Sequence, residues 1–131
     1  MYRFVILHHQ STMDEHWDVM LETDAALTTW SIPPQLPTGL SFACPAVQLP
    51  DHRKHYLDYE GEIVGNRGTV FRIDTGTYNQ LSPEMYILYG TTFSGKLTAK
   101  NDEMTFEPFG TPDSAARTSR QEIFRKGEMT G

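Results

Sequence analysis

Histidine is concentrated in the first half of this sequence. All five histidines among the 131 residues come before residue 56, at His8, His9, His16, His52 and His55. The tripeptide His16-Trp17-Asp18 combines the nitrogen and oxygen donors of a metal site. If it lies in a strand, His16 and Asp18 point to the same face, about 7 Å apart at the backbone. Both side chains would then reach a single ion.

A third ligand is available across one predicted turn. Residues 3–9 are expected to form a strand ending at His9, and the polar turn 10–15 would bring His9 alongside His16. Two imidazoles and one carboxylate suit Mn, Fe or Zn rather than Mg or Ca, and leave positions open for water or substrate. A structural interpretation also fits the spacing: Asp18 accepts a backbone amide hydrogen bond and His16 only pairs with it. Under this interpretation, loop histidines such as His8 and His55 have no role.

Short strands must position these residues. Proline and glycine divide the first 110 residues into segments rich in β-branched and aromatic residues, with no convincing helix. We predict strands at 3–9, 16–22, 27–32, 46–49, 68–74, 86–89, 92–99 and 103–107, with a turn at Thr75-Gly76 and another at 100–102. This pattern predicts a mainly β fold, a small antiparallel β-barrel. The residues expected to contribute to burial are Trp17, Val19, Leu21, Trp30, Ile32, Val70 and Phe71.

The chain divides into one domain, 1–110, and a C-terminal tail, 111–131, predicted to be short and helical or disordered. Asp113-Ser114 is a candidate helix cap, but few apolar residues follow it. Basic residues crowd the tail, so a second interpretation is an arm that binds a phosphate backbone. They are Arg117, Arg120, Arg125 and Lys126.

Composition limits the possible partners and locations. Eleven basic against seventeen acidic residues give a net charge of -6, whereas nucleic-acid-binding proteins usually present a basic face, so any polyanion must be met locally. No apolar run approaches the ~20 residues of a membrane-spanning helix, and the first residues lack the features of a signal peptide. The single cysteine, Cys44, excludes an internal disulfide and a thiolate zinc cage. We expect a cytoplasmic protein with no membrane partner.

A wider set of motifs resembles a known family. In order along the chain they are RFVILHH at 3–9, HWDVMLE at 16–22, LTTWSIP at 27–33, Asp51-His52, Tyr56, YEG at 59–61 and GTV at 68–70. As a set they resemble the 3′-phosphoesterase domain that accompanies bacterial DNA ligase D in end joining and also occurs as a free-standing protein. The resemblance covers residues 3 to 80, with a continuation to about residue 107.

The resemblance implies a compact β-barrel that removes 3′-terminal ribonucleotides and 3′-phosphates from primer ends with manganese. It assigns His9, His16 and Asp18 to the metal and His52 to the scissile phosphate, and it places Tyr56 near the same site. One extra residue between the first two site histidines leaves His8 as an alternative to His9.

Three positions depart from the family pattern. Where the resemblance implies phosphate-binding cations, this chain has Met20, Pro34 and Cys44. Because phosphoryl transfer depends on neutralising negative charge, the loss of three donors should cost several kcal/mol. Replacement cations are available at Arg53, Lys54 and Arg67.

Three functions are compatible with the sequence. The favoured one is a manganese-dependent phosphoesterase with altered phosphate-binding residues, acting on a nucleic-acid 3′ end or a phosphate-bearing small molecule; Zn or Fe are the alternative metals. The second is a non-catalytic module that has kept the fold and the metal. The third is an iron oxygenase whose facial triad is His16, Asp18 and His52.

Overall fold

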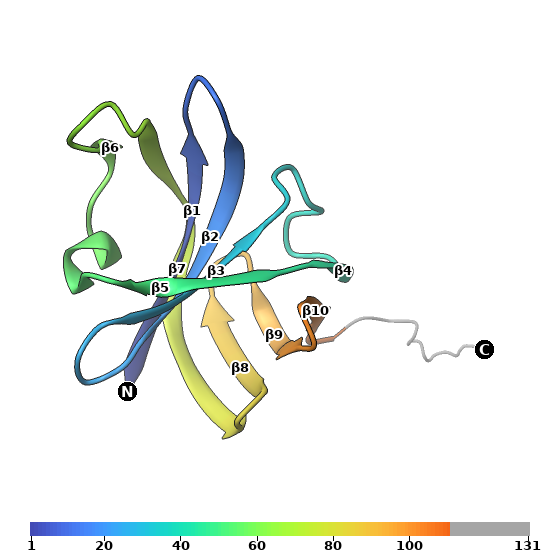
Figure 1. The fold of residues 1–131 in the computed structure, drawn as a ribbon. Helices are drawn as coiled ribbons and strands as arrows, with labels where there is room; N and C mark the ends of the chain where they lie inside the picture. The colour runs from blue at the N-terminus through green and yellow to red at the C-terminus, as the bar shows by residue number, and fades with distance from the viewer. Residues whose placement is uncertain (111–131) are drawn as a thin grey trace.

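The computed structural model describes residues 1–110, which form a strongly twisted antiparallel sheet (Figure 1). The predicted mainly β fold is confirmed. The strands are β1 (Tyr2–Gln10), β2 (Glu15–Glu22), β3 (Leu27–Ile32), β4 (Phe42–Pro45), β5 (Val47–His52), β6 (Gly61–Glu62), β7 (Thr69–Ser82), β8 (Met85–Gly90), β9 (Ser94–Lys100) and β10 (Glu103–Pro108), with one 3₁₀ turn, η1 (Lys54–Leu57).

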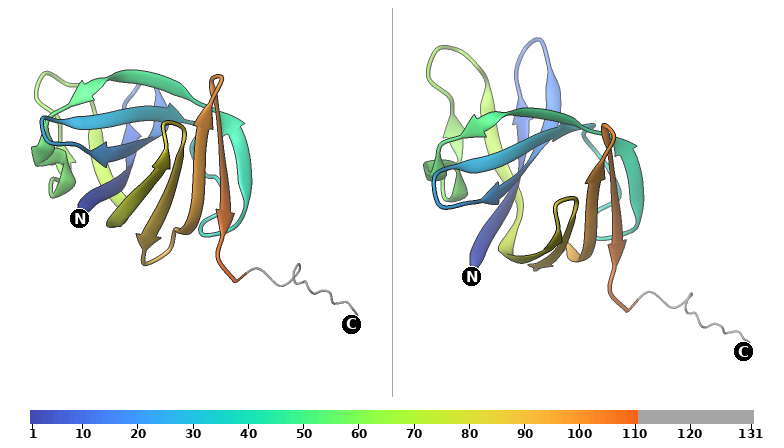
Figure 2. Two further views of the ribbon diagram at one scale, coloured as in Figure 1. Left: turned by 90° about the horizontal axis from the view of Figure 1, so that it is seen from below. Right: turned by 60° about the horizontal axis from the view of Figure 1, so that its bottom comes forward.

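The sheet closes on itself through one nearly continuous segment of chain. Its strand order is β4-β10-β9-β8-β7-β1-β2-β3-β5, so the two ends of the order are neighbours in sequence. β4 pairs with β10, and β5 pairs with β3. Between them, the Ala46 amide donates a hydrogen bond to the Asp102 carbonyl at 2.9 Å. Figure 2 shows this segment arching from one side of the sheet to the other, which makes the fold a barrel.

Strand β2 presents a different surface on each side. Trp17, Val19 and Leu21 face the barrel interior, as their alternation predicts. There they join an aromatic-rich core that includes Phe4, Trp30, Tyr78, Tyr86, Leu88, Phe93, Leu97, Met104 and Phe106. Asp18 and Met20 face the outside of the barrel and are nevertheless buried.

A second, smaller core covers that outer side. It consists of Val5, Leu7, Met20, Leu27, Leu57 and Val70, with Tyr56, Tyr59 and Ile63 packed against it. The covering residues come from the segment between β5 and β7, which contains η1 and the short strand β6. This segment supplies one wall of the site described below.

Two expectations about β7 were wrong. The chain does not turn at Thr75-Gly76, because β7 runs on to Ser82 and pairs with β8 from Gly76 onward. A Cβ on Gly76 would lie 2.1 Å from the carbonyl oxygen of Tyr89, so this glycine permits close strand approach. Phe71 is 54% exposed, so it does not contribute to the core as expected; it pairs with His8 of β1 and lies before Gly76, where the pairing with β8 begins.

Several expectations concern what the structure does not describe. The helix predicted after Asp113 and the boundary at residue 110 concern the tail, 111–131, which lies outside the described residues. Within residues 1–110, no helix is long and apolar enough to cross a membrane. The cytoplasmic location stays a prediction.

Candidate functional site

The β1–β2 hairpin places two histidines side by side. His9 and His16 are direct cross-strand partners, and their ring centroids lie 4.7 Å apart. Asp18 lies two residues along β2 from His16 and points to the same side. One ligand atom from each of the three residues falls within 4.8 Å of the other two. The grouping expected from the sequence is therefore present.

Each imidazole is held by a partner outside the cluster. His9 donates a hydrogen bond from Nε2 to the Arg67 carbonyl at 2.7 Å, and His16 donates from Nδ1 to the Asp14 carboxylate at 2.7 Å. The other nitrogen of each ring faces Asp18: Nδ1 of His9 lies 3.6 Å from Oδ2, and Nε2 of His16 lies 3.1 Å from Oδ1. Outer partners of this kind orient the histidines of metal sites.

The cluster has an excess of electron-pair donors. In their neutral forms both imidazoles turn a lone pair toward a carboxylate, an arrangement that is relieved by a proton on one ring or by a cation among the three groups. Asp18 is 2% exposed, and its Oδ1 atom is buried beside Nε2 of His16, which can donate to it only when both nitrogens of the His16 ring carry a proton. The Asp18 carboxylate raises the pKa of His16 despite the opposing effect of burial. The residues present thus fit a divalent metal of the Mn, Fe or Zn type.

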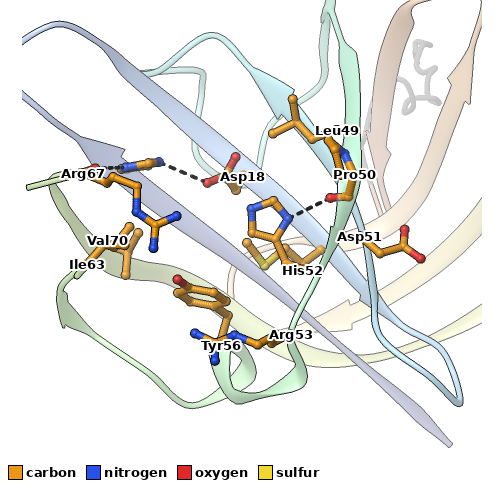
Figure 3. A pocket seen from close by; sticks show the side chains of 12 residues that line it. Asp18, Leu49, Pro50, Asp51, His52, Arg53, Tyr56, Ile63, Arg67 and Val70 are labelled. Atoms are coloured by element: carbon orange, nitrogen blue, oxygen red, sulfur yellow. Dashed lines mark hydrogen bonds and ion pairs between the residues drawn. The ribbon is translucent and has the colours of Figure 1, made fainter. Parts of the chain in front are cut away.

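A pocket of about 510 Å³ opens beside the cluster (Figure 3). His9 and Asp18 border it on the side of the β1–β2 hairpin. The rest of the lining comes from the end of β5, from η1 and from the turn before β7, which is hydrogen-bonded to His9. The remaining lining residues are Met20, Leu49, Pro50, Asp51, His52, Arg53, Tyr56, Ile63, Arg67 and Val70.

His52 and Tyr56 both belong to this pocket, as expected. His52 donates from Nδ1 to the carbonyl of Pro50 at 2.9 Å, which leaves Nε2 available to the pocket. The His52 and Tyr56 ring centroids are 5.8 Å apart. Figure 3 shows the imidazole on the side of the pocket toward Asp18. A metal-type cluster and two polar groups able to contact an anion therefore share one cavity.

Comparison with known proteins identifies the family. A model of the DNA Ligase D 3'-phosphoesterase domain matches residues 7–123. The chain belongs to this family. It is also 35% identical, over 79 residues, to the multifunctional non-homologous end joining protein LigD of Mycobacterium bovis and to the corresponding DNA repair protein LigD of Mycobacterium tuberculosis. The alignment covers 58% of this chain and 10% of each of those proteins.

Within this 3′-phosphoesterase domain, the remaining histidines lie elsewhere. His8 alternates with His9 along β1 and pairs with Glu15 at 2.6 Å, so His9 is the histidine beside His16. His55 is exposed and packs on Tyr56, with ring centroids 4.1 Å apart, and it does not line the pocket. His52 is not part of the three-residue cluster among the described residues, which argues against the iron-triad interpretation.

The positions where the phosphoesterase resemblance implied cations do not form one group. Met20 lines the pocket and is apolar, whereas Cys44 lies on β4 in the barrel interior. Pro34 does not line the pocket. Among the replacement cations, Lys54 forms an ion pair with Glu22, with 3.6 Å between Nζ and Oε2, and it does not line the pocket. Arg53 and Arg67 do line the pocket. The sequence did not predict that the Arg67 carbonyl would hold His9; the nearby Gly65 and Gly68 were the signal of a tight turn there.

Proposed function

We propose that this chain is a divalent-metal-dependent phosphoesterase acting on 3′ ends of nucleic acid. The observation that carries the proposal is that His9 and Asp18 of the metal-type cluster line the same cavity as His52 and Tyr56. Family membership supports the 3′-end substrate. The chain spans only a tenth of the LigD relatives, so their end-joining and repair roles are not assumed for it.

His9, His16 and Asp18 would hold the metal, and manganese is the proposed ion. Such a metal supplies a Lewis acid that polarises a phosphoryl oxygen or a bound water. The hydrogen bonds of His9 to Arg67 and of His16 to Asp14 keep both rings turned toward Asp18. Preset ligands require little rearrangement when the ion binds.

His52 and Tyr56 act on the phosphate. With Nδ1 bonded to the Pro50 carbonyl, protonated His52 donates from Nε2 to a phosphoryl oxygen or to the departing oxygen. The Tyr56 hydroxyl is a second donor in the pocket, and it is uncharged. Both groups stabilise charge that develops during P–O cleavage.

The test is release of phosphate from a 3′-phosphate primer, and of nucleoside from a 3′-ribonucleotide primer, with Mn²⁺ or with EDTA. We expect His16→Ala and Asp18→Asn each to abolish turnover and the calorimetric Mn²⁺ signal. His8→Ala is the matched control, since His8 lies on the same hairpin and faces the other way. Turnover by wild type in EDTA, or undiminished turnover by Asp18→Asn, would refute the proposal.

A non-catalytic metal-bearing module is the second candidate, and the apolar Met20 in the pocket favours it. It predicts Mn²⁺ binding that depends on His16 and Asp18, without release of phosphate or nucleoside from either primer. The two assays together separate the candidates.

A further inference from the structure

The lining of the pocket contains two arginines, Arg53 and Arg67. Arg67 comes from the turn before β7, and Arg53 follows β5 directly. Figure 3 shows the Arg67 side chain directed into the space bordered by Asp18, His52 and Tyr56, while the Asp51 carboxylate points away from it. The Arg67 guanidinium can therefore meet an anion that enters the cavity, and Arg53 also lines it.

Arg67 is fixed at its base by the turn that carries it. Its Nε donates to the Val64 carbonyl at 2.8 Å, and the Ile63 amide donates to the Gly68 carbonyl at 2.8 Å. Asn66 adopts a φ of 56° and Gly68 a φ of 98°, which makes the turn tight. An arginine held through Nε loses little additional freedom when it binds a ligand.

The two terminal nitrogens of Arg67 remain available. Among residues 1–110 they make no hydrogen bond or ion pair, and Arg53 likewise has no ion-pair partner there. A guanidinium with both terminal nitrogens free presents parallel donors that match two oxygens of a phosphate. Both arginines are exposed to solvent, and Met20, Ile63 and Val70 form the apolar part of the same pocket lining.

Arg67 also links the anion side of the pocket to the metal side. Its backbone carbonyl accepts the hydrogen bond from His9 Nε2 at 2.7 Å. One residue therefore orients a metal ligand with its main chain and offers two donors to the cavity with its side chain. A terminal phosphate monoester, with two negative charges and three free oxygens, is the group that spans a metal on one side and a guanidinium on the other.

We propose that Arg67 is the principal phosphate-binding cation of this pocket and that Arg53 assists it. The inference rests on the proposed function and names the side chains that hold the phosphate group in it. Arg67 and Arg53 thereby provide the charge that Met20 does not.

The test is calorimetric titration with thymidine 3′-monophosphate, first without metal and then with Mn²⁺, alongside a separate Mn²⁺ titration. We expect Arg67→Ala to weaken nucleotide binding by about ten- to a hundredfold. Arg67→Lys and Arg53→Ala should each weaken nucleotide binding less than Arg67→Ala does. Arg72→Ala is the control, an exposed arginine on β7 outside the pocket. Mn²⁺ affinity should be unchanged in all four variants, because the partner of His9 is a main-chain carbonyl that substitution retains.

Three results would overturn the inference: no nucleotide binding by wild type under either condition, equal binding by Arg67→Ala, or an equal loss in Arg72→Ala. The proposed function fails separately. If the primers are not cleaved but nucleotide binding depends on Arg67, the anion site stands and the catalytic role does not. If Arg67→Ala cleaves 3′-phosphate primers at the wild-type rate and KM, the catalytic role stands and the anion site does not.

Discussion

The buried carboxylate of Asp18 lowers the stability of the metal-free fold, but it completes the group of metal ligands. A buried carboxylate that faces the lone pairs of two neutral imidazoles is unfavourable unless a proton or a metal cation lies among them. On the interior side of β2, by contrast, every buried side chain is apolar. The outer side of β2 thus gives up some stability in the metal-free protein to keep three donors together.

This conflict predicts how metal affects stability. At pH 8 without metal, Asp18→Asn should unfold at a temperature equal to or above that of wild type, because the amide removes a poorly solvated charge. Mn²⁺ should raise the melting temperature of wild type, since a ligand of the native state alone stabilises it, and should leave the variant unchanged. Scanning fluorimetry with and without Mn²⁺ measures both effects. An equal shift in the two proteins would contradict the assignment of Asp18 as a ligand.

Cys44 is the opposite case, because its surroundings make a reactive type of side chain unreactive. Burial, with a smaller contribution from Glu103, raises the pKa of its thiol to about 11. At pH 8 only about a thousandth is thiolate, so iodoacetamide should modify the folded protein slowly, with the rate rising about tenfold per pH unit up to pH 10. Mass spectrometry follows the labelling, and the guanidinium-unfolded chain is the control. Rapid labelling of the folded protein at pH 8 would place Cys44 outside the barrel interior.

At the scale of elements, alternation in short strands predicted most of the site. The alternation of side chains in β2 predicted that Asp18 and Trp17 point to opposite faces. The short turn between β1 and β2 predicted that His9 lies beside His16. What alternation missed depends on distant neighbours. Gly76 resembles a turn residue in the sequence, but in the structure it pairs with Gly90 of β8, and Phe71 resembles a core residue but lies before the part of β7 that pairs with β8. The resemblance implied a phosphate-binding position at Cys44, which instead packs inside the barrel.

The turn that carries Arg67 offers a test at this scale. A Cβ on Gly68 would lie 2.2 Å from the carbonyl oxygen of Gln10, and the residue has a φ of 98°. Gly65, in the same turn, has a φ of 83° but no such backbone clash. Gly68→Ala should therefore cost about 1–3 kcal/mol more unfolding free energy than Gly65→Ala in urea titrations. Equal losses would mean that the turn does not pack against β1 as described.

For the molecule as a whole, a net charge of -6 opposes a polyanion everywhere except at local cations. The barrel brings two arginines to its pocket, and an end-directed enzyme needs few contacts along the duplex. This favours recognition of a terminus over binding along the length of DNA.

The charge balance predicts a weak dependence of DNA binding on salt. Two arginine charges at the terminal phosphate displace about two counterions, so the slope of log K against log salt should be about -2 for a duplex with a 3′-phosphate. Fluorescence anisotropy between 50 and 200 mM KCl is the measurement, with the 3′-hydroxyl duplex as control. A slope on the order of -5 or steeper would instead assign binding to the basic residues of the tail, 111–131.

The two faces of β2 serve different purposes, so substitutions on one face should have different effects from substitutions on the other. In a library of all single substitutions at residues 16–19 and 21, selected separately for protein abundance and for 3′-end processing, the two scores should separate by parity; Met20 is left out because it is buried in the second core. Changes at the odd positions Trp17, Val19 and Leu21 should lower abundance, because they open the barrel core. Changes at His16 and Asp18 should leave abundance intact and remove processing. Scores without this parity would mean that the two faces of the strand are not independent, and that selection on the barrel also constrains the site.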